Sequence, residues 1–289
     1  MQYHPAAPPS VVVGIDGSRN ALDAALWAVD EAVSRDIPLR LVSAIDPDRS
    51  PGADPHDAAR ELAKAEIAIR YAYVAVESTD QPVKIEVEIL QERPIRALLE
   101  ASRSAEMVCV GSMGLKHSAQ GQVGSTAAAL ANCAHCPVTI VGRHDPRAAQ
   151  RRCVVAEVDG SPASDGVLTH AMTEARLRGV PLRVLTTWQS RFTESHDGDA
   201  VADGNRLAGA QLDRRLAQWR KRHPELDVDA VTFHGSTLTY LTDNAGSVQL
   251  LVIGRERPHG VAELVRPPGY AALRNADCSV LICEPRHLL

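Results

Sequence analysis

The sequence predicts an α/β fold that is built twice along the chain. Short apolar runs alternate with stretches whose apolar residues recur at helical spacing, a pattern typical of a parallel sheet with helices on both faces. The same series of runs then returns later in the chain at a constant offset. We therefore expect the 289 residues to form two homologous domains.

The repeat keeps one register over most of its length. The segment VGIDGS at 13–18 returns as AEVDGS at 156–161, so Asp16 corresponds to Asp159 and the offset is 159 − 16 = 143 residues. The same offset relates Gly111 to Gly254. The polar segment 144–150 lies between the two copies, which predicts domains at residues 1–147 and 148–289.

The elements of the first half follow from local pattern. An unbroken apolar run predicts the first strand, and apolar residues at helical spacing from Leu22 to Val33 predict the helix after it. Pro94 opens a later helix, because proline suits the first helical turn. Strands are expected at 11–15, 39–45, 83–90, 107–110 and 138–141, and further helices at 57–76, 94–103 and 125–132.

The second half keeps the buried pattern of the first. Its apolar runs predict strands that include residues 154–155, 182–187, 250–253 and 280–282. The cysteine before the last run, Cys278, stands one residue early relative to Cys136, so the register could slip by one near the end. The sheet is therefore expected to survive in both copies.

Composition and charge exclude several classes of protein. Hydrophobic residues make up 45% and charged residues 23%, the balance of a globular protein. No apolar run reaches about 18 residues, so no membrane span is expected, and residues 1–10 lack the features of a secretory signal. The net charge of −5 and the absence of a basic half argue against nucleic-acid binding. Six cysteines without regular spacing favour a reducing cytoplasm.

A group of glycines after the fourth strand carries the clearest functional signal. Gly111, Gly114, Gly124 and Ser125 form the pattern G-x2-G-x9-G-S/T. The first two glycines allow a tight turn and close approach of a ligand, and Gly124 and Ser125 are expected to offer free amide donors at a helix N-terminus. The hydroxyls of Ser125 and Thr126 are further donors at this helix N-terminus. The amides and hydroxyls together would suit a triphosphate. The pattern is neither a Walker A loop nor the dinucleotide fingerprint.

These motifs resemble those of the universal stress protein family. The segment 12–18 looks like the opening of such a domain, the glycine pattern looks like the ATP-binding loop of the family, and the resemblance covers nearly all of both halves. It implies two tandem Rossmann-like domains of the adenine nucleotide α-hydrolase type, each with a five-stranded parallel sheet of order 3-2-1-4-5. It also implies ATP, possibly with Mg2+, at the switch point, and pairing through the last strands in a homodimer or within the chain.

The resemblance also assigns roles to residues of the first half. Asp16 would bind the adenosine part of the nucleotide. The remaining implied contacts are Gly14 and Ala44 at the base, Val110, Gly111 and Gly114 at the ribose and the phosphate turn, and Gly124, Ser125 and Thr126 at the phosphates.

The second half departs from the binding pattern. Gly14 corresponds to Glu157, Gly114 corresponds to Arg257, and Gly124 and Ser125 correspond to two prolines at 267 and 268. Proline has no N–H, so the anion-binding donors are lost there. We expect ATP in the first half only, with the second half acting as a scaffold that pairs with the first. A different anion site made of Arg255, Arg257 and His259 is the alternative.

Other signals are weaker. Cys133 and Cys136 have C-x2-C spacing, which favours structural packing over a redox or zinc site. Lys116 and His117 lie in the spacer between the glycines and could reach a phosphate, and the spacer 116–123 is the expected moving element. No nucleophile with a base, no metal cluster and no other catalytic residue is found, so an enzyme is not expected, although slow ATP hydrolysis is left open.

The leading hypothesis is an ATP-binding stress-response regulator. The alternatives are an enzyme that uses ATP, such as a slow ATPase or a nucleotidyl transferase, and a nucleotide-independent interaction scaffold.

Overall fold

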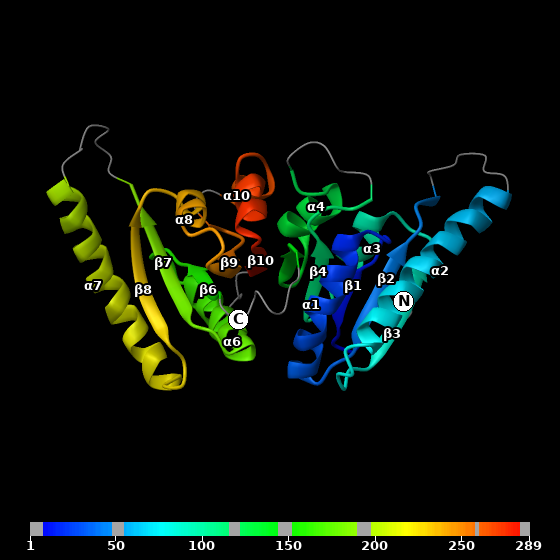
Figure 1. Ribbon diagram of the computed structural model, residues 1–289, viewed down its shortest axis with the longest axis horizontal. Helices are drawn as coiled ribbons and strands as arrows, with labels where there is room; N and C mark the ends of the chain where they lie inside the picture. The colour runs from blue at the N-terminus through cyan, green and yellow to red at the C-terminus, as the bar shows by residue number, and fades with distance from the viewer. Residues whose placement is uncertain are drawn as a thin grey trace, which may run out of the picture. The chain divides into compact units, whose positions relative to one another are not determined.

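The computed structural model describes residues 8–47, 55–115, 122–143, 152–189, 198–257 and 260–283. The chain divides into two compact units, Met1–His144 and Asp145–Leu289. Each unit is an α/β domain in which strands and helices alternate along the chain (Figure 1). The predicted boundary between residues 147 and 148 lies in a stretch outside the described residues, so its exact place stays a prediction.

The first unit has a parallel sheet of five strands. They are β1 (Val11–Gly14), β2 (Leu39–Ala44), β3 (Ile85–Leu90), β4 (Met107–Gly111) and β5 (Val138–Val141). Their order is β3-β2-β1-β4-β5, and each neighbouring pair is parallel. This confirms the order 3-2-1-4-5. The order reverses between β1 and β4, so the carboxyl ends of these two strands mark the switch point.

Four helices of the described residues cover the two faces of this sheet. They are α1 (Arg19–Arg35), α2 (Pro55–Glu77), α3 (Pro94–Ala101) and α4 (Ser125–Cys133). Helices α1 and α2 pack together on one face, and α3 and α4 pack together on the other. The start of α1 is fixed by the Ser18 hydroxyl, which accepts a hydrogen bond from the amide of Ala21, and Pro94 stands at the start of α3 as predicted.

The second unit repeats this arrangement. Its strands are β6 (Cys153–Glu157), β7 (Leu182–Trp188), β8 (Val228–His234), β9 (Val248–Gly254) and β10 (Ser279–Cys283), in the parallel order β8-β7-β6-β9-β10. Its helices are α6 (Ser164–Arg178), α7 (Gly198–Arg222), α8 (Thr237–Asp243), α9 (Ala262–Val265) and α10 (Gly269–Ala276). The sheet therefore survives in the second copy, as the sequence predicts.

The repeat is also visible in the packing inside each unit. Glu31 in α1 and Glu174 in α6 stand 174 − 31 = 143 residues apart, and both are fully buried. Each pairs with an arginine one helical turn later, Arg35 or Arg178. The last strands confirm the slip by one residue, because Val108 lies opposite Val138 in the first unit and Leu251 lies opposite Val280 in the second.

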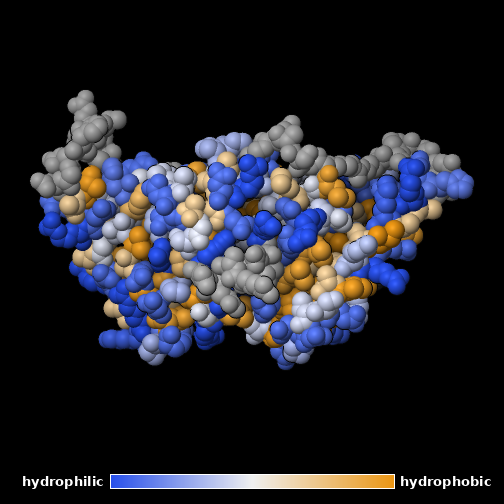
Figure 2. Space-filling model, viewed as in Figure 1, coloured by the Kyte–Doolittle hydropathy of each residue, from blue (hydrophilic) through white to orange (hydrophobic). Residues whose placement is uncertain are grey.

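The surface over α2 mixes hydrophilic and hydrophobic residues (Figure 2). Ile67, Tyr71 and Val74 are exposed on this helix, whereas Ala65 and Ile69 are buried. Among the described helices, none is long and apolar enough to cross a membrane.

Candidate functional site

The predicted site residues of the first unit gather at the carboxyl ends of three neighbouring strands. Gly14 ends β1, Ala44 ends β2 and Gly111 ends β4, and β1 pairs with both of the other strands. Asp16 lies two residues after the end of β1. The parallel sheet thus brings these residues, which lie far apart in the sequence, to one edge.

Asp16 links the two loops that border this edge. Its Oδ1 accepts a hydrogen bond of 2.9 Å from the amide of Ser18, and its Oδ2 accepts one of 3.2 Å from the amide of Leu115. Asp16 is exposed, and a carboxylate can accept about four hydrogen bonds. It therefore keeps room for donors from a ligand while it holds the loops together.

Gly14 and Gly114 lie in close contact with other parts of the first unit. A Cβ at Gly114 would lie 2.5 Å from Asp16 Oδ2, and a Cβ at Gly14 would lie 2.9 Å from Leu98 Cδ1 and 3.2 Å from Val110 Cγ1. Any larger residue at Gly114 would displace the carboxylate. Both glycines are thus needed for the shape of this edge.

Gly111 is closely packed against another part of the protein and does not face open space. A Cβ at Gly111 would lie 2.5 Å from the carbonyl carbon of Asn20, in the first turn of α1. The Asn20 side chain also donates a hydrogen bond of 2.9 Å to the Ser112 hydroxyl. The sequence pattern assigned this glycine to a turn near a ligand, but the structure shows that it lets α1 pack on the end of β4.

The N-terminus of α4 corrects one detail of the predicted phosphate cradle. The amide of Gly124 is not free, because it donates a hydrogen bond of 2.9 Å to the carbonyl oxygen of Ser112. Gly124 is the N-cap and provides no side-chain cap, so the first amides inside the helix, those of Ser125 and Thr126, are the ones without helical partners. Ser125 is exposed. Lys116, His117 and most of the spacer lie outside the described residues.

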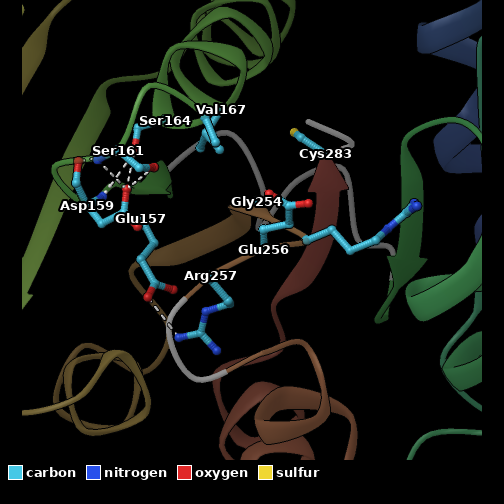
Figure 3. Close-up of a pocket in the computed structure, with 11 residues that line it drawn as sticks. Glu157, Asp159, Ser161, Ser164, Val167, Gly254, Glu256, Arg257 and Cys283 are labelled. Carbon is cyan, nitrogen blue, oxygen red and sulfur yellow. Dashed lines mark hydrogen bonds and ion pairs between the residues drawn. The ribbon is translucent and has the colours of Figure 1, made fainter. Parts of the chain in front are cut away.

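The equivalent place in the second unit is filled by an ion pair (Figure 3). Arg257 Nη2 lies 2.8 Å from Glu157 Oε1, and Arg257 Nη1 lies 2.7 Å from Glu263 Oε2. The side chains of Arg257 and Glu157 are only 4% and 9% exposed. The two residues that replace Gly14 and Gly114 thus pair with each other in a buried position, and Arg257 also binds Glu263.

The start of α10 also differs from the start of α4. Pro268 is its N-cap, and the amide of Tyr270 donates to the carbonyl oxygen of Arg266. A Cβ at Gly269 would lie 1.9 Å from the carbonyl oxygen of Glu263, so α9 packs directly against this helix start. Gly269 is the first residue of this helix, but its close contact with α9 leaves it unavailable to an anion.

Asp159 keeps the position of Asp16 and the hydrogen bond from the equivalent serine amide, and it gains hydroxyl partners. Its Oδ1 accepts hydrogen bonds from the amide and hydroxyl of Ser161 and from the hydroxyl of Ser164. Burial acts to raise the pKa of Asp159, but the hydrogen bonds from Ser161 and Ser164 together outweigh it and lower the pKa below its ordinary value. Asp159 is therefore a carboxylate held by its own loop.

The family of the chain follows from comparison with known proteins. The model of the universal stress protein family matches residues 9–142 and again residues 150–284. The chain belongs to the universal stress protein family. Each match corresponds to one of the two units, so this is a tandem member with two universal stress protein domains.

Relatives match this chain over nearly their whole length. Universal stress protein Rv2028c of Mycobacterium tuberculosis H37Rv is 49% identical over 283 residues, which cover 97% of this chain and 98% of the relative. Universal stress protein Rv2624c of the same organism is 41% identical over 274 residues, with 94% and 95% covered. A crystal structure of a universal stress protein from Archaeoglobus fulgidus has a TM-score of 0.71 at 17% identity and covers 96% of each chain, which supports the fold.

Sequence reasoning missed the most specific contact in the second universal stress protein domain. It flagged Glu157 and Arg257 separately as obstacles, but it did not pair them. The signal was present, because their counterparts Gly14 and Gly114 belong to one predicted site and the two replacements carry opposite charges. Among the described residues, no group of three or more His, Cys, Asp or Glu could hold a metal ion.

Proposed function

We propose that this universal stress protein binds ATP in its first domain only and acts as a stress-response regulator. The observation that carries the proposal is the contrast between the two domains at the same edge of the sheet. In the first, residues 14 and 114 are both glycine and the neighbouring Asp16 is exposed, whereas in the second the equivalent residues Glu157 and Arg257 form a buried ion pair.

The groups around the first edge suit the parts of ATP. The amides and hydroxyls of Ser125 and Thr126 would bind the phosphates, because the N-terminus of a helix attracts anions. Asp16 would accept hydrogen bonds from the adenosine part. The base would lie near Gly14 and Ala44, and the ribose near Val110 and Gly111. Mg2+ would come with the phosphates, since this cation is commonly held by phosphate oxygens and water.

The second domain is expected to bind ATP at least about tenfold more weakly than the first. The amide of Gly124 is already bonded to Ser112, so the relevant loss is the donor of Ser125, which corresponds to proline in the second domain. One such loss to a charged ligand costs about 1.5–3 kcal/mol, which is roughly tenfold or more, since about 1.4 kcal/mol is tenfold. The carboxylate of Glu157 adds repulsion, so ATP is assigned to the first domain.

Nucleotide occupancy would regulate the protein by shifting a conformational or assembly equilibrium. A ligand does this only when it binds one state better than another. Pairing of domains through their last strands, within the chain or in a homodimer, is the proposed assembly, and the cytoplasm is the proposed location. We assign no catalytic residue, so slow ATP hydrolysis is the alternative to pure binding.

Calorimetric titration of the full chain with ATP and magnesium tests the proposal. We expect one ATP per chain, and we expect Gly124→Glu to abolish the binding because a carboxylate would stand at the phosphate position. The matched control is Gly160→Glu in the second domain, an exposed glycine where an added Cβ would meet nothing within 4 Å. Binding that survives Gly124→Glu, or its absence from the unaltered protein, would favour the nucleotide-independent scaffold.

A further inference from the structure

The first domain concentrates exposed apolar side chains on helix α2. Eight large hydrophobic residues are exposed among the described residues, and five of them lie on this helix: Leu62, Ile67, Tyr71, Tyr73 and Val74. The helix lies on the outside of the domain beside the edge strand β3 (Figure 1). Exposed apolar side chains are ordinary when they are scattered, but a cluster of them indicates an interaction surface.

Three of these side chains form a stripe along α2. Ile67, Tyr71 and Val74 are spaced at i, i+4 and i+7, so they share one face of the helix, and their exposed fractions are 58%, 73% and 51%. The opposite face, which includes Ile69 and Ala72, is buried. The helix is therefore apolar on two faces, and only the inner one is covered within the described part of the first domain.

The equivalent helix of the second domain lacks this stripe. At the constant offset of 143 residues, α7 has Ala210, Arg214 and Ala217 at the three positions, and all three are exposed. The buried Ile69 corresponds to the buried Leu212, so the inner face is kept. Since both domains have the same sheet, the outer stripe is not needed for the fold.

Two charged residues flank the stripe on one side. Glu66 and Arg70 directly precede Ile67 and Tyr71, so both lie along the same flank. A glutamate and an arginine four residues apart could pair within a helix, as charges earlier in α2 do with their neighbours. Both Glu66 and Arg70 are exposed, and neither forms an ion pair within the described part of the chain. An acid and a base are thus open to an outside partner beside an apolar stripe.

We propose that α2 of the first domain binds α2 of a second copy of this chain in antiparallel orientation. In a two-fold interface, residue i of one copy contacts residue j of the other and the reverse. An axis near residue 68 places Glu66 opposite Arg70 of the second copy and Arg70 opposite Glu66. Ile67 then lies close to the axis, and Tyr71 faces a turn of the other helix where Ala63 is exposed and leaves room for the ring.

Other arrangements do not pair these charges. In a parallel pair of helices, the flank with Glu66 and Arg70 would meet the opposite flank of the second copy. The proposed contact uses a surface distinct from the last strands and needs no nucleotide, so it stands apart from the function proposed above. One pair of helices buries less area than a standard protein interface, and we therefore expect association in the micromolar range.

Sedimentation velocity of the full chain without nucleotide tests the surface. Tyr71→Arg, which copies Arg214 of the second domain, should raise the dissociation constant at least about tenfold, because a central aromatic side chain carries much of the binding energy of an interface. Arg214→Glu on α7 is the matched control and should leave the constant unchanged. A chain that stays monomeric throughout the micromolar range would overturn the proposal. So would association that is indifferent to Tyr71→Arg, as pairing through the last strands alone would be.

Charge exchange tests the antiparallel orientation. Glu66→Arg places arginine opposite Arg70 of the second copy, and Arg70→Glu places glutamate opposite Glu66. Each single variant should weaken association at least about tenfold through repulsion of like charges. The double variant restores both pairs with their charges exchanged, so its dissociation constant should return to within about threefold of the original. Single variants without effect, or a double variant that does not recover, would contradict this contact.

Discussion

At the scale of single residues, the second domain shows how a site can be closed without disturbing a core. Glu157 and Arg257 bring opposite charges to positions where the first domain has glycine. Each would be costly to bury alone, but together they form a pair that is almost fully enclosed. The pair should therefore behave as a unit in mutagenesis.

Removal of one partner should destabilise the protein more than removal of both. Arg257→Met leaves the buried Glu157 carboxylate uncompensated, which should cost on the order of 3–5 kcal/mol. Arg257→Met combined with Glu157→Met replaces the pair by apolar groups and should cost much less. Urea unfolding of the single and double variants measures both effects, and strictly additive losses would argue against the pair.

The cysteines should differ strongly in reactivity. Cys133 is exposed, whereas Cys278 is buried, and burial raises the pKa of the Cys278 thiol to about 12. Since the thiolate is the reactive form, iodoacetamide at pH 8 should modify Cys133 in the folded protein and reach Cys278 only after unfolding. Mass mapping of the labelled peptides checks this. Early labelling of Cys278 would show that its burial is not maintained in solution.

At the scale of elements, the strands were predictable and the contacts between elements were not. Apolar or alternating runs located the strands of the first unit to within about two residues, because a strand needs apolar residues on each face that it buries, and the edge strand β3 alternates them with glutamate. The role of Gly111 was missed, because its neighbour Asn20 belongs to a helix far upstream in the sequence. The bond from the Gly124 amide to Ser112 was missed for the same reason. Local pattern carries little information about such long-range contacts.

The close packing of α1 on β4 gives a test with an internal control. Gly111→Ala places a Cβ 2.5 Å from the backbone of Asn20, whereas at the equivalent Gly254 the nearest atom is Val167 Cγ2 at 3.4 Å. Gly111→Ala should therefore cost roughly 1–3 kcal/mol, as overpacking does, and Gly254→Ala should cost less. Thermal unfolding of the two variants compares them directly. A larger loss for Gly254→Ala would contradict the described packing.

At the scale of the whole molecule, the two universal stress protein domains have the same sheet but different residues at the site. The order 3-2-1-4-5 and the buried Glu31 and Glu174 are preserved in both. Gly14, Gly114 and the Gly-Ser helix start that would serve a nucleotide are found only in the first, although Gly111 is kept as Gly254. The fold, the family and the altered second site could all be derived from the sequence, because they depend on pattern and on residue type. The pairing of Glu157 with Arg257 required the structure.

Native mass spectrometry of the full chain with ATP and magnesium tests the central claim most directly. The protein should carry one ATP per chain. Gly114→Arg, which copies the residue of the second domain and crowds Asp16, should carry none. Two ATP molecules per chain, or one that persists in Gly114→Arg, would contradict the assignment of the nucleotide to the first domain.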